Sequence, residues 1–195
     1  FWTQDEFQAF LECVADKPIS YYAFEMLYWT GIREGELLAL TPADFNFEKK
    51  TLRINKSYQR LEGKDVITEP KTPKSNRTIV MPDFLTIEME DFIKSIYGIK
   101  MDDRIFTISK SYLHHEMDRG AKLAGVKRIR IHGLRHSHIS LLINLGFSAL
   151  AIGERVGHEA VDITYHYAHL FPTVQTDMAA QLETEREALV NVRKE

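Results

Sequence analysis

The sequence predicts an α+β fold that is mainly α-helical, with a small three-stranded antiparallel sheet near the middle of the chain. Apolar residues recur at helical spacing through most of the 195 residues, whereas the stretch from Thr51 to Pro82 alternates apolar and polar residues. Glycines close several of the helical stretches, as helix-ending residues often do. The length suits one domain with a full hydrophobic core.

The composition is that of a soluble globular protein, with 44% hydrophobic and 27% charged residues. No apolar run approaches the roughly 20 residues of a membrane span, and no signal peptide is visible. The single cysteine, Cys13, has no partner for an internal disulfide. These features predict a cytoplasmic protein without a membrane segment.

Charge is unevenly distributed along the chain. Residues 49–135 carry 19 Lys and Arg against 11 Asp and Glu, while both flanks are acidic and the whole chain has a net charge of −3. A basic middle favours a face that contacts nucleic acid, although charge blocks in sequence need not be patches in space.

The first helices have clear boundaries. Thr3 and Glu6 have the spacing of a capping box, which predicts a helix of about 12 residues after Thr3. An aromatic-rich helix is expected from about Tyr21 to Thr30, with Gly31 at its end and a short leucine-rich helix beyond. Further helices are predicted over residues 83–97, 109–124 and 131–145.

The alternating stretch predicts a meander of three strands, which begin near Leu52, Val66 and Thr78. A basic loop over residues 69–77 is expected between the second and third strands. Beyond residue 171, apolar side chains again recur at helical spacing. We therefore divide the chain into a domain of residues 1–171 and a tail helix of residues 172–195.

Four side chains near the end of the chain point to phosphate chemistry. His132 and Arg135 share a helix face, and an imidazole beside a guanidinium offers donors to phosphate oxygens. His158 follows Gly157, and Tyr167 lies nine residues further on. A phenol is a poor nucleophile unless cations or a base help to remove its proton, which suggests a phosphate site beside a tyrosine nucleophile.

A second arginine motif lies near the N-terminal third. Arg33 stands at the start of the short helix and Glu36 one turn later. An arginine is disfavoured there by the helix dipole, which suggests that Arg33 binds a ligand and that Glu36 orients it.

These motifs resemble those of the tyrosine recombinases, the phage-integrase family. The chain has Thr30-Gly31-Ile32-Arg33 in a TGxRxxEL context, His132-Gly-Leu-Arg135-His136 for HxLRH, Val156-Gly157-His158 for LGH, and Tyr167-Ala168-His169 for the tyrosine motif. The resemblance covers nearly the whole chain and implies the tyrosine-recombinase catalytic-domain fold.

The resemblance also implies residue roles. Arg33 and Arg135 would bind the scissile phosphate, and His132 and His158 would add hydrogen bonds, with His132 helping to take the phenol proton. Tyr167 would attack to give a 3′-phosphotyrosyl bond, and Lys71, in a KTxxSxR-like context, would protonate the leaving oxygen. Tyr165 is the alternative nucleophile, but on a helix it faces away from Tyr167.

Weaker DNA contacts are expected from basic residues outside this set: Lys74, Arg77, Lys127, Arg128 and Arg130. His136 and His138 are expected to contact DNA phosphate or to pack. No metal site and no cofactor are expected, because no ligand pattern accompanies the eight histidines.

The implied partner is double-stranded DNA. The full-length protein is expected to act as a tetramer on DNA, whereas this chain, an apparent catalytic fragment, should be a monomer with weak DNA binding. The tail helix docks either on its own domain or on a neighbouring protomer. A type IB topoisomerase-like enzyme and a catalytically silent DNA-binding regulator are the alternative functions.

Overall fold

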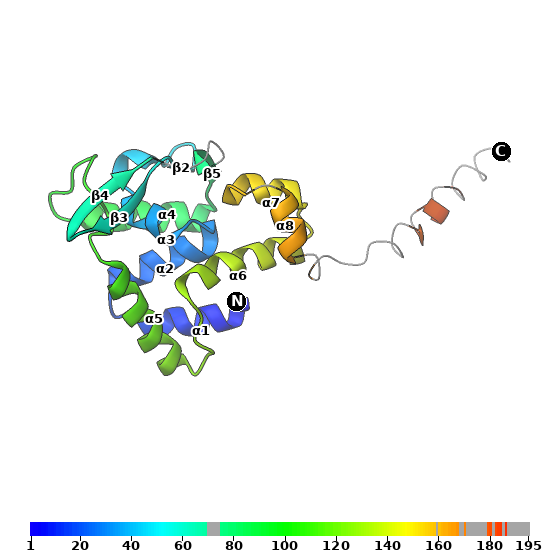
Figure 1. The fold of residues 1–195 in the computed structure, drawn as a ribbon, viewed down its shortest axis with the longest axis horizontal. Coiled ribbons are helices and arrows are strands. Elements are labelled where there is room, and N and C mark those ends of the chain that lie inside the picture. Colours follow the sequence, from blue (N-terminus) through cyan, green and yellow to red (C-terminus); the bar gives the residue numbers. More distant parts are fainter. Residues whose placement is uncertain are drawn as a thin grey trace.

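The computed structural model confirms the predicted fold class, mostly helical with a small antiparallel sheet (Figure 1). It describes residues 1–69, 75–158, 160–167 and 170, with a few tail positions at 179–180, 182–184 and 186. The predicted tail helix therefore lies largely outside the described residues. In the described ranges, none of the helices has both the length and the apolar character needed to cross a membrane.

Four of the longer helices lie together in one part of the domain (Figure 1). They are α1 (Gln4–Val14), α2 (Pro18–Thr30), α5 (Lys110–Ala124) and α6 (Ile131–Asn144). Helix α1 packs against α5, and α2 packs against α6. The predicted capping box is present, with the Thr3 hydroxyl accepting from the Glu6 N–H and the Glu6 carboxylate accepting from the Thr3 N–H.

The sheet differs from the predicted meander. Strand β2 (Thr51–Ile54) lies between β1 (Phe45–Asn46) and β5 (Arg77–Val80), and all pairs are antiparallel. The expected second strand belongs instead to a separate hairpin of β3 (Ser57–Leu61) and β4 (Lys64–Thr68). The three-stranded meander was wrong because Leu52 pairs with Ile79 and both are buried, so the hairpin between them stays outside the ladder.

Shorter elements complete the fold. Helix α3 (Glu34–Ala39) and the turn η1 (Pro42–Asp44) lead from α2 into the sheet, and α4 (Asp83–Ser95) follows it. Helices α7 (Ala149–Val156) and α8 (Ala160–Tyr167) pack on each other beside the end of α6, where Figure 1 shows them as a small lobe.

Apolar residues form two clusters. The main core gathers side chains from α1 to the start of α6, including the sheet. A smaller cluster joins α6, α7 and α8 through Ile139, Ile143, Ile152, Val156 and Ile163, and it includes the ring of Tyr167. The last residue of α8 is therefore fixed by packing against α6 and α7.

Candidate active site

Arg33 is positioned by the end of α2. Gly31 adopts a left-handed conformation with φ of 66°, and its N–H donates to the Leu27 carbonyl, which closes the helix. The chain then turns so that Arg33 becomes the N-cap of α3. Its backbone N–H donates to Glu36 Oε2 at 2.8 Å and its Nη1 donates to Glu36 Oε1 at 2.9 Å. Glu36 thus contacts both the backbone and the guanidinium of Arg33, and the Arg33 side chain keeps 35% exposure.

Arg135 lies under this turn, in the first half of α6, with 1% exposure. Its Nη1 donates to the Gly31 carbonyl at 2.6 Å, and its Nη2 donates to the Val156 carbonyl. These carbonyls belong to the C-terminal ends of α2 and α7, where helices carry partial negative charge. The guanidinium thus joins three helices, while its Nε has no hydrogen-bond partner among the described residues.

The environment of Arg135 is short of negative charge. Burial, followed by the positive charge of Arg33, lowers the pKa of Arg135 to about 9, while Glu36 acts in the opposite direction. The side chain therefore remains cationic at neutral pH. A buried cation held mainly by carbonyl groups is well suited to an anionic ligand, because a buried charge is costly without a counter-charge.

His132 and His158 stand at the edge of this cation site. His132 is in the first turn of α6 and exposed, and His158 follows α7, where its N–H donates to the Gly153 carbonyl at 2.9 Å. Partial burial and then neighbouring positive charges, including those of Arg135 and Arg33, lower the pKa of each histidine to about 4. Both imidazoles are neutral at pH 7, so each has one N–H to donate.

Tyr167 ends α8 and is 7% exposed. Burial raises the pKa of its phenol to about 12, and the charge of Arg135 opposes that shift. Tyr165 is 83% exposed, in contrast to Tyr167. The Tyr167 hydroxyl is hydrogen-bonded to Nδ1 of His136.

Sequence reasoning did not assign His136 to the tyrosine. The available signal was its position four residues after His132, which puts both rings on one helix face. The two rings are in edge contact, with centroids 4.8 Å apart. His138, two residues further on, is buried and packs, and its Nε2 accepts from Nε of Arg155 at 3.0 Å.

Arg77 requires a correction. We expected a DNA contact, but the side chain is 6% exposed and its Nη1 and Nη2 hold the two oxygens of Glu36 at 3.0 and 2.9 Å. Its Nε donates to the Arg155 carbonyl at 2.9 Å. Because these bonds consume most of its donors within the protein, Arg77 supports Glu36 and is not a surface contact for DNA.

Arg155 is a second structural arginine that the sequence did not reveal. It lies in the last turn of α7, and its guanidinium donates to the Val80 carbonyl at 3.0 Å and the Trp29 carbonyl at 3.2 Å, besides His138. These bonds tie α7 to β5, α2 and α6. The turn that carries His158 is thereby held next to Arg33, whose Nη2 lies 3.5 Å from the Gly157 carbonyl.

The remaining predicted contacts have different outcomes. Lys71 and Lys74 lie outside the described residues. Lys127, Arg128 and Arg130 are exposed just before α6, although Arg128 is paired with Asp118 at 2.6 Å. Within the described ranges, no three His, Cys, Asp or Glu side chains are grouped as metal ligands.

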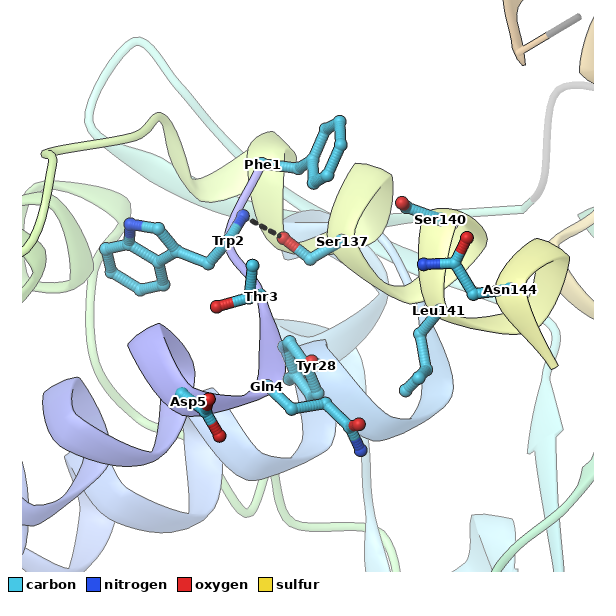
Figure 2. Close-up of a pocket in the computed structure, with 10 residues that line it drawn as sticks. All are labelled: Phe1, Trp2, Thr3, Gln4, Asp5, Tyr28, Ser137, Ser140, Leu141 and Asn144. Atoms are coloured by element: carbon cyan, nitrogen blue, oxygen red, sulfur yellow. Dashed lines mark hydrogen bonds between the residues drawn. The ribbon is translucent and has the colours of Figure 1, made fainter. Parts of the chain in front are cut away.

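A surface pocket lies where the N-terminal segment meets α6 (Figure 2). The backbone N–H of Trp2 donates to the Ser137 hydroxyl at 2.8 Å, as Figure 2 shows. The Trp2 side chain is buried and donates to the Lys127 carbonyl at 2.6 Å. This segment buttresses α6, and its pocket contains none of the predicted site residues.

The chain belongs to the phage integrase family, whose model matches residues 1–173. It is 31% identical to the ICEBs1 integrase of Bacillus subtilis, over 94% of this chain and 54% of that protein. It is 30% identical to the integrase of Staphylococcus phage L54a, over 83% of this chain and 51% of that protein. The chain thus spans about half the length of the curated relatives it matches.

Solved structures give the same fold. The Tn1549 transposon integrase in complex with a circular intermediate DNA aligns with a TM-score of 0.75 at 23% identity, over 95% of this chain and 65% of that one. The catalytic domain of bacteriophage HP1 integrase aligns with a TM-score of 0.64 at 20% identity, over 93% of both chains.

Proposed function

We propose that this chain is the catalytic domain of a site-specific DNA recombinase, which integrates or excises a mobile element by cleaving and rejoining DNA strands through a 3′-phosphotyrosyl intermediate. The observation that carries the proposal is the buried, cationic Arg135 beside the only buried tyrosine hydroxyl of α8. A guanidinium can bind phosphate oxygens, and a phenol can supply the oxygen that attacks phosphorus.

The cations would act on the phosphate. Arg33 and Arg135 would bind its non-bridging oxygens, where charge builds up in the transition state, and preorganised donors of this kind give large rate enhancements. His132 and His158, as neutral N–H donors, would add hydrogen bonds.

The strand transfer conserves bond energy. The Tyr167 oxygen would form a bond to phosphorus as the bond from phosphorus to the 5′ oxygen breaks, with Lys71 proposed to protonate that oxygen. Attack by a 5′ hydroxyl then reverses the step on the same or another strand. The protein's own cations would neutralise the phosphate, so we propose that no metal and no cofactor take part.

Assembly is a further part of the proposal. The full-length recombinase would act as a tetramer on double-stranded DNA, and the tail of residues 172–195 would dock on a neighbouring protomer. Exposed apolar side chains of α8, of the start of α7 and of the segment between α6 and α7 offer an acceptor surface: Leu145, Phe147, Leu150, Val161 and Tyr165. Truncation after residue 171 should leave DNA binding intact but abolish higher-order complexes. Unchanged assembly would favour docking on the same domain.

The decisive test is covalent trapping. The protein is incubated with a pool of nicked duplexes whose sequence beside the nick is randomised, so that cleavage releases a short strand and leaves an adduct resistant to denaturant. An adduct that forms equally with and without EDTA supports the proposal. DNA binding without any adduct would support the silent regulator instead, and a complete block by EDTA would contradict metal independence.

The reaction products distinguish a type IB topoisomerase from a site-specific recombinase. A type IB enzyme would relax supercoiled plasmids of any sequence, whereas a site-specific recombinase should form adducts only with a subset of the pool. Sequencing the trapped strands therefore distinguishes the two and also gives the target site.

A further inference from the structure

The position of His136 on α6 links it directly to the nucleophile. Its Nδ1 is hydrogen-bonded to the Tyr167 hydroxyl, and the two ring centroids are 5.7 Å apart. His132, one turn earlier, makes an edge-to-face contact with the His136 ring, and among the described residues no hydrogen bond joins it to Tyr167. Among the described histidines, it is therefore His136 that touches the reacting oxygen.

The Tyr167 phenol must lose its proton as it attacks. With a pKa raised to about 12 by burial, it is almost fully protonated at neutral pH. Burial lowers the pKa of His136, followed by the positive charge of the N-terminal amino group and then by that of Arg135. A neutral imidazole with its proton on Nε2 has a free lone pair at Nδ1, which is the atom that faces the phenol.

The surroundings of the pair suit a proton transfer. Tyr167 is fixed by the small apolar cluster of α6, α7 and α8, and His136 is fixed by α6, so their contact needs no rearrangement of either helix. The Arg135 charge favours the phenolate form of Tyr167. His132, at the exposed start of α6, is left free to bind the phosphate.

We propose that His136 is a catalytic residue, the general base that receives the Tyr167 phenol proton at Nδ1 during attack, an assignment that rests on the proposed strand transfer. The phenol O–H bond breaks and an Nδ1–H bond forms, while the tyrosine oxygen bonds to phosphorus and the bond to the 5′ oxygen breaks. On religation the imidazolium returns the proton to the phenol. This assignment replaces His132 as the proton acceptor.

The test measures single-turnover cleavage of a trapped sequence from the nicked pool. His136→Ala should cleave on the order of 100-fold to 10,000-fold more slowly, the usual contribution of a general base, with unchanged DNA affinity. His136→Asn keeps a hydrogen-bonding amide near the Nδ1 position but cannot accept a proton, so it should remain at least about tenfold slow. Wild-type cleavage by either variant would overturn the proposal.

A more acidic nucleophile separates proton transfer from positioning. Replacing Tyr167 with difluorotyrosine lowers the phenol pKa and reduces the need for a base, so it should recover much of the rate lost in His136→Asn. His132→Ala is the matched control, because loss of a phosphate contact should not be rescued. Rescue of His132→Ala and not of the His136 variants would return the role to His132.

The outcomes separate this inference from the proposed function. If the unmodified protein forms no adduct with any duplex, the strand-transfer function fails. If it forms adducts and His136→Asn forms them at the same rate, only the role of His136 fails. Circular dichroism and thermal melts of each variant confirm that the proteins compared are folded.

Discussion

Arg77 holds both carboxylate oxygens of Glu36 in a buried two-pronged ion pair, with Nη1 and Nη2 at 3.0 and 2.9 Å. Burial alone would raise the pKa of Glu36, but hydrogen bonding to Arg77, with Arg33 adding to it, keeps that pKa below its usual value. Glu36 in turn accepts a hydrogen bond from the guanidinium of Arg33. A residue of β5 thus fixes the proposed phosphate ligand at the start of α3.

Arg77→Met should reduce both stability and cleavage. Removing one partner of a buried ion pair costs about 3–5 kcal/mol, because the Glu36 carboxylate is left without its main counter-charge. Cleavage should also fall, since Arg33 loses its anchored partner. Urea unfolding and adduct formation measure the two effects.

A matched control is available in α5. Arg119 pairs with the buried Glu116 at 2.7 Å within α5, a helix that Figure 1 shows apart from α8. Arg119→Met should lose stability but keep the cleavage rate at a temperature where it remains folded. Equal loss of cleavage in both variants would indicate that Arg77 acts only through global stability.

Gly31→Ala should damage the site more than an ordinary helix-end substitution. Gly31 has φ of +66°, and an added Cβ would lie 2.5 Å from the His138 ring. The Gly31 carbonyl also accepts from Arg135. Gly125→Ala is the matched control, since Gly125 has φ of +67° with nothing within 4 Å of the added Cβ.

We expect Gly125→Ala to cost about 1 kcal/mol, the strain of a left-handed side chain, and to leave cleavage unchanged. Gly31→Ala should cost clearly more and should slow cleavage by displacing Arg135. If the two variants had similar free energies of unfolding, the close contact between the added Cβ and His138 would cost no stability beyond the backbone strain that both variants share.

Much of this arrangement follows from local sequence. The capping box at Thr3, the glycine ends of α2 and α5, and the helical spacing of His132 and Arg135 depend on residues within one or two turns, so their interpretation needs no tertiary information. The order of the motifs along the chain likewise needs no tertiary information. These features predicted the helical fold class.

The features that the sequence did not predict depend on contacts between residues far apart in the chain. Arg77 appeared to be a surface cation because its partner Glu36 lies 41 residues away. The partners of Arg155 are likewise backbone carbonyls of Trp29 and Val80, which carry no signature in the sequence. The sheet was misread for a related reason, since β2 pairs with β5 across the whole inserted hairpin.

Glu25→Gln should stabilise the protein at alkaline pH. Glu25 is 4% exposed, and its Oε2 has no hydrogen-bond partner among the described residues. Burial, and then the negative charge of Glu88, raises the pKa of Glu25 from 4.5 to about 7. The proton is therefore held more tightly in the folded state than in the unfolded state.

This difference in proton affinity sets how the stability of the protein changes with pH. The stabilising effect of this proton is fully present below about pH 4.5 and is lost as the pH rises through about 7. Relative to the wild type, Glu25→Gln should gain on the order of 1–3 kcal/mol near pH 8 and little near pH 4.5. Urea unfolding at the two pH values measures this gain, and a gain of equal size at both would contradict the account.

Arg135→Lys should lose on the order of 100-fold to 1,000-fold in cleavage rate. An ammonium group cannot bridge the Gly31 and Val156 carbonyls and still present a second donor to phosphate, as the guanidinium fork can. Single-turnover adduct formation measures the loss. Near-normal cleavage by this variant would count against a two-pronged role for Arg135.

The identity of the nucleophile is the most direct test of the account. The trapped adduct is digested with protease, and the peptide that carries the DNA is sequenced by mass spectrometry. We expect DNA on Tyr167, and no adduct from Tyr167→Phe while duplex binding stays within a few fold of the wild type. DNA attached to Tyr165, or an adduct that survives Tyr167→Phe, would contradict it.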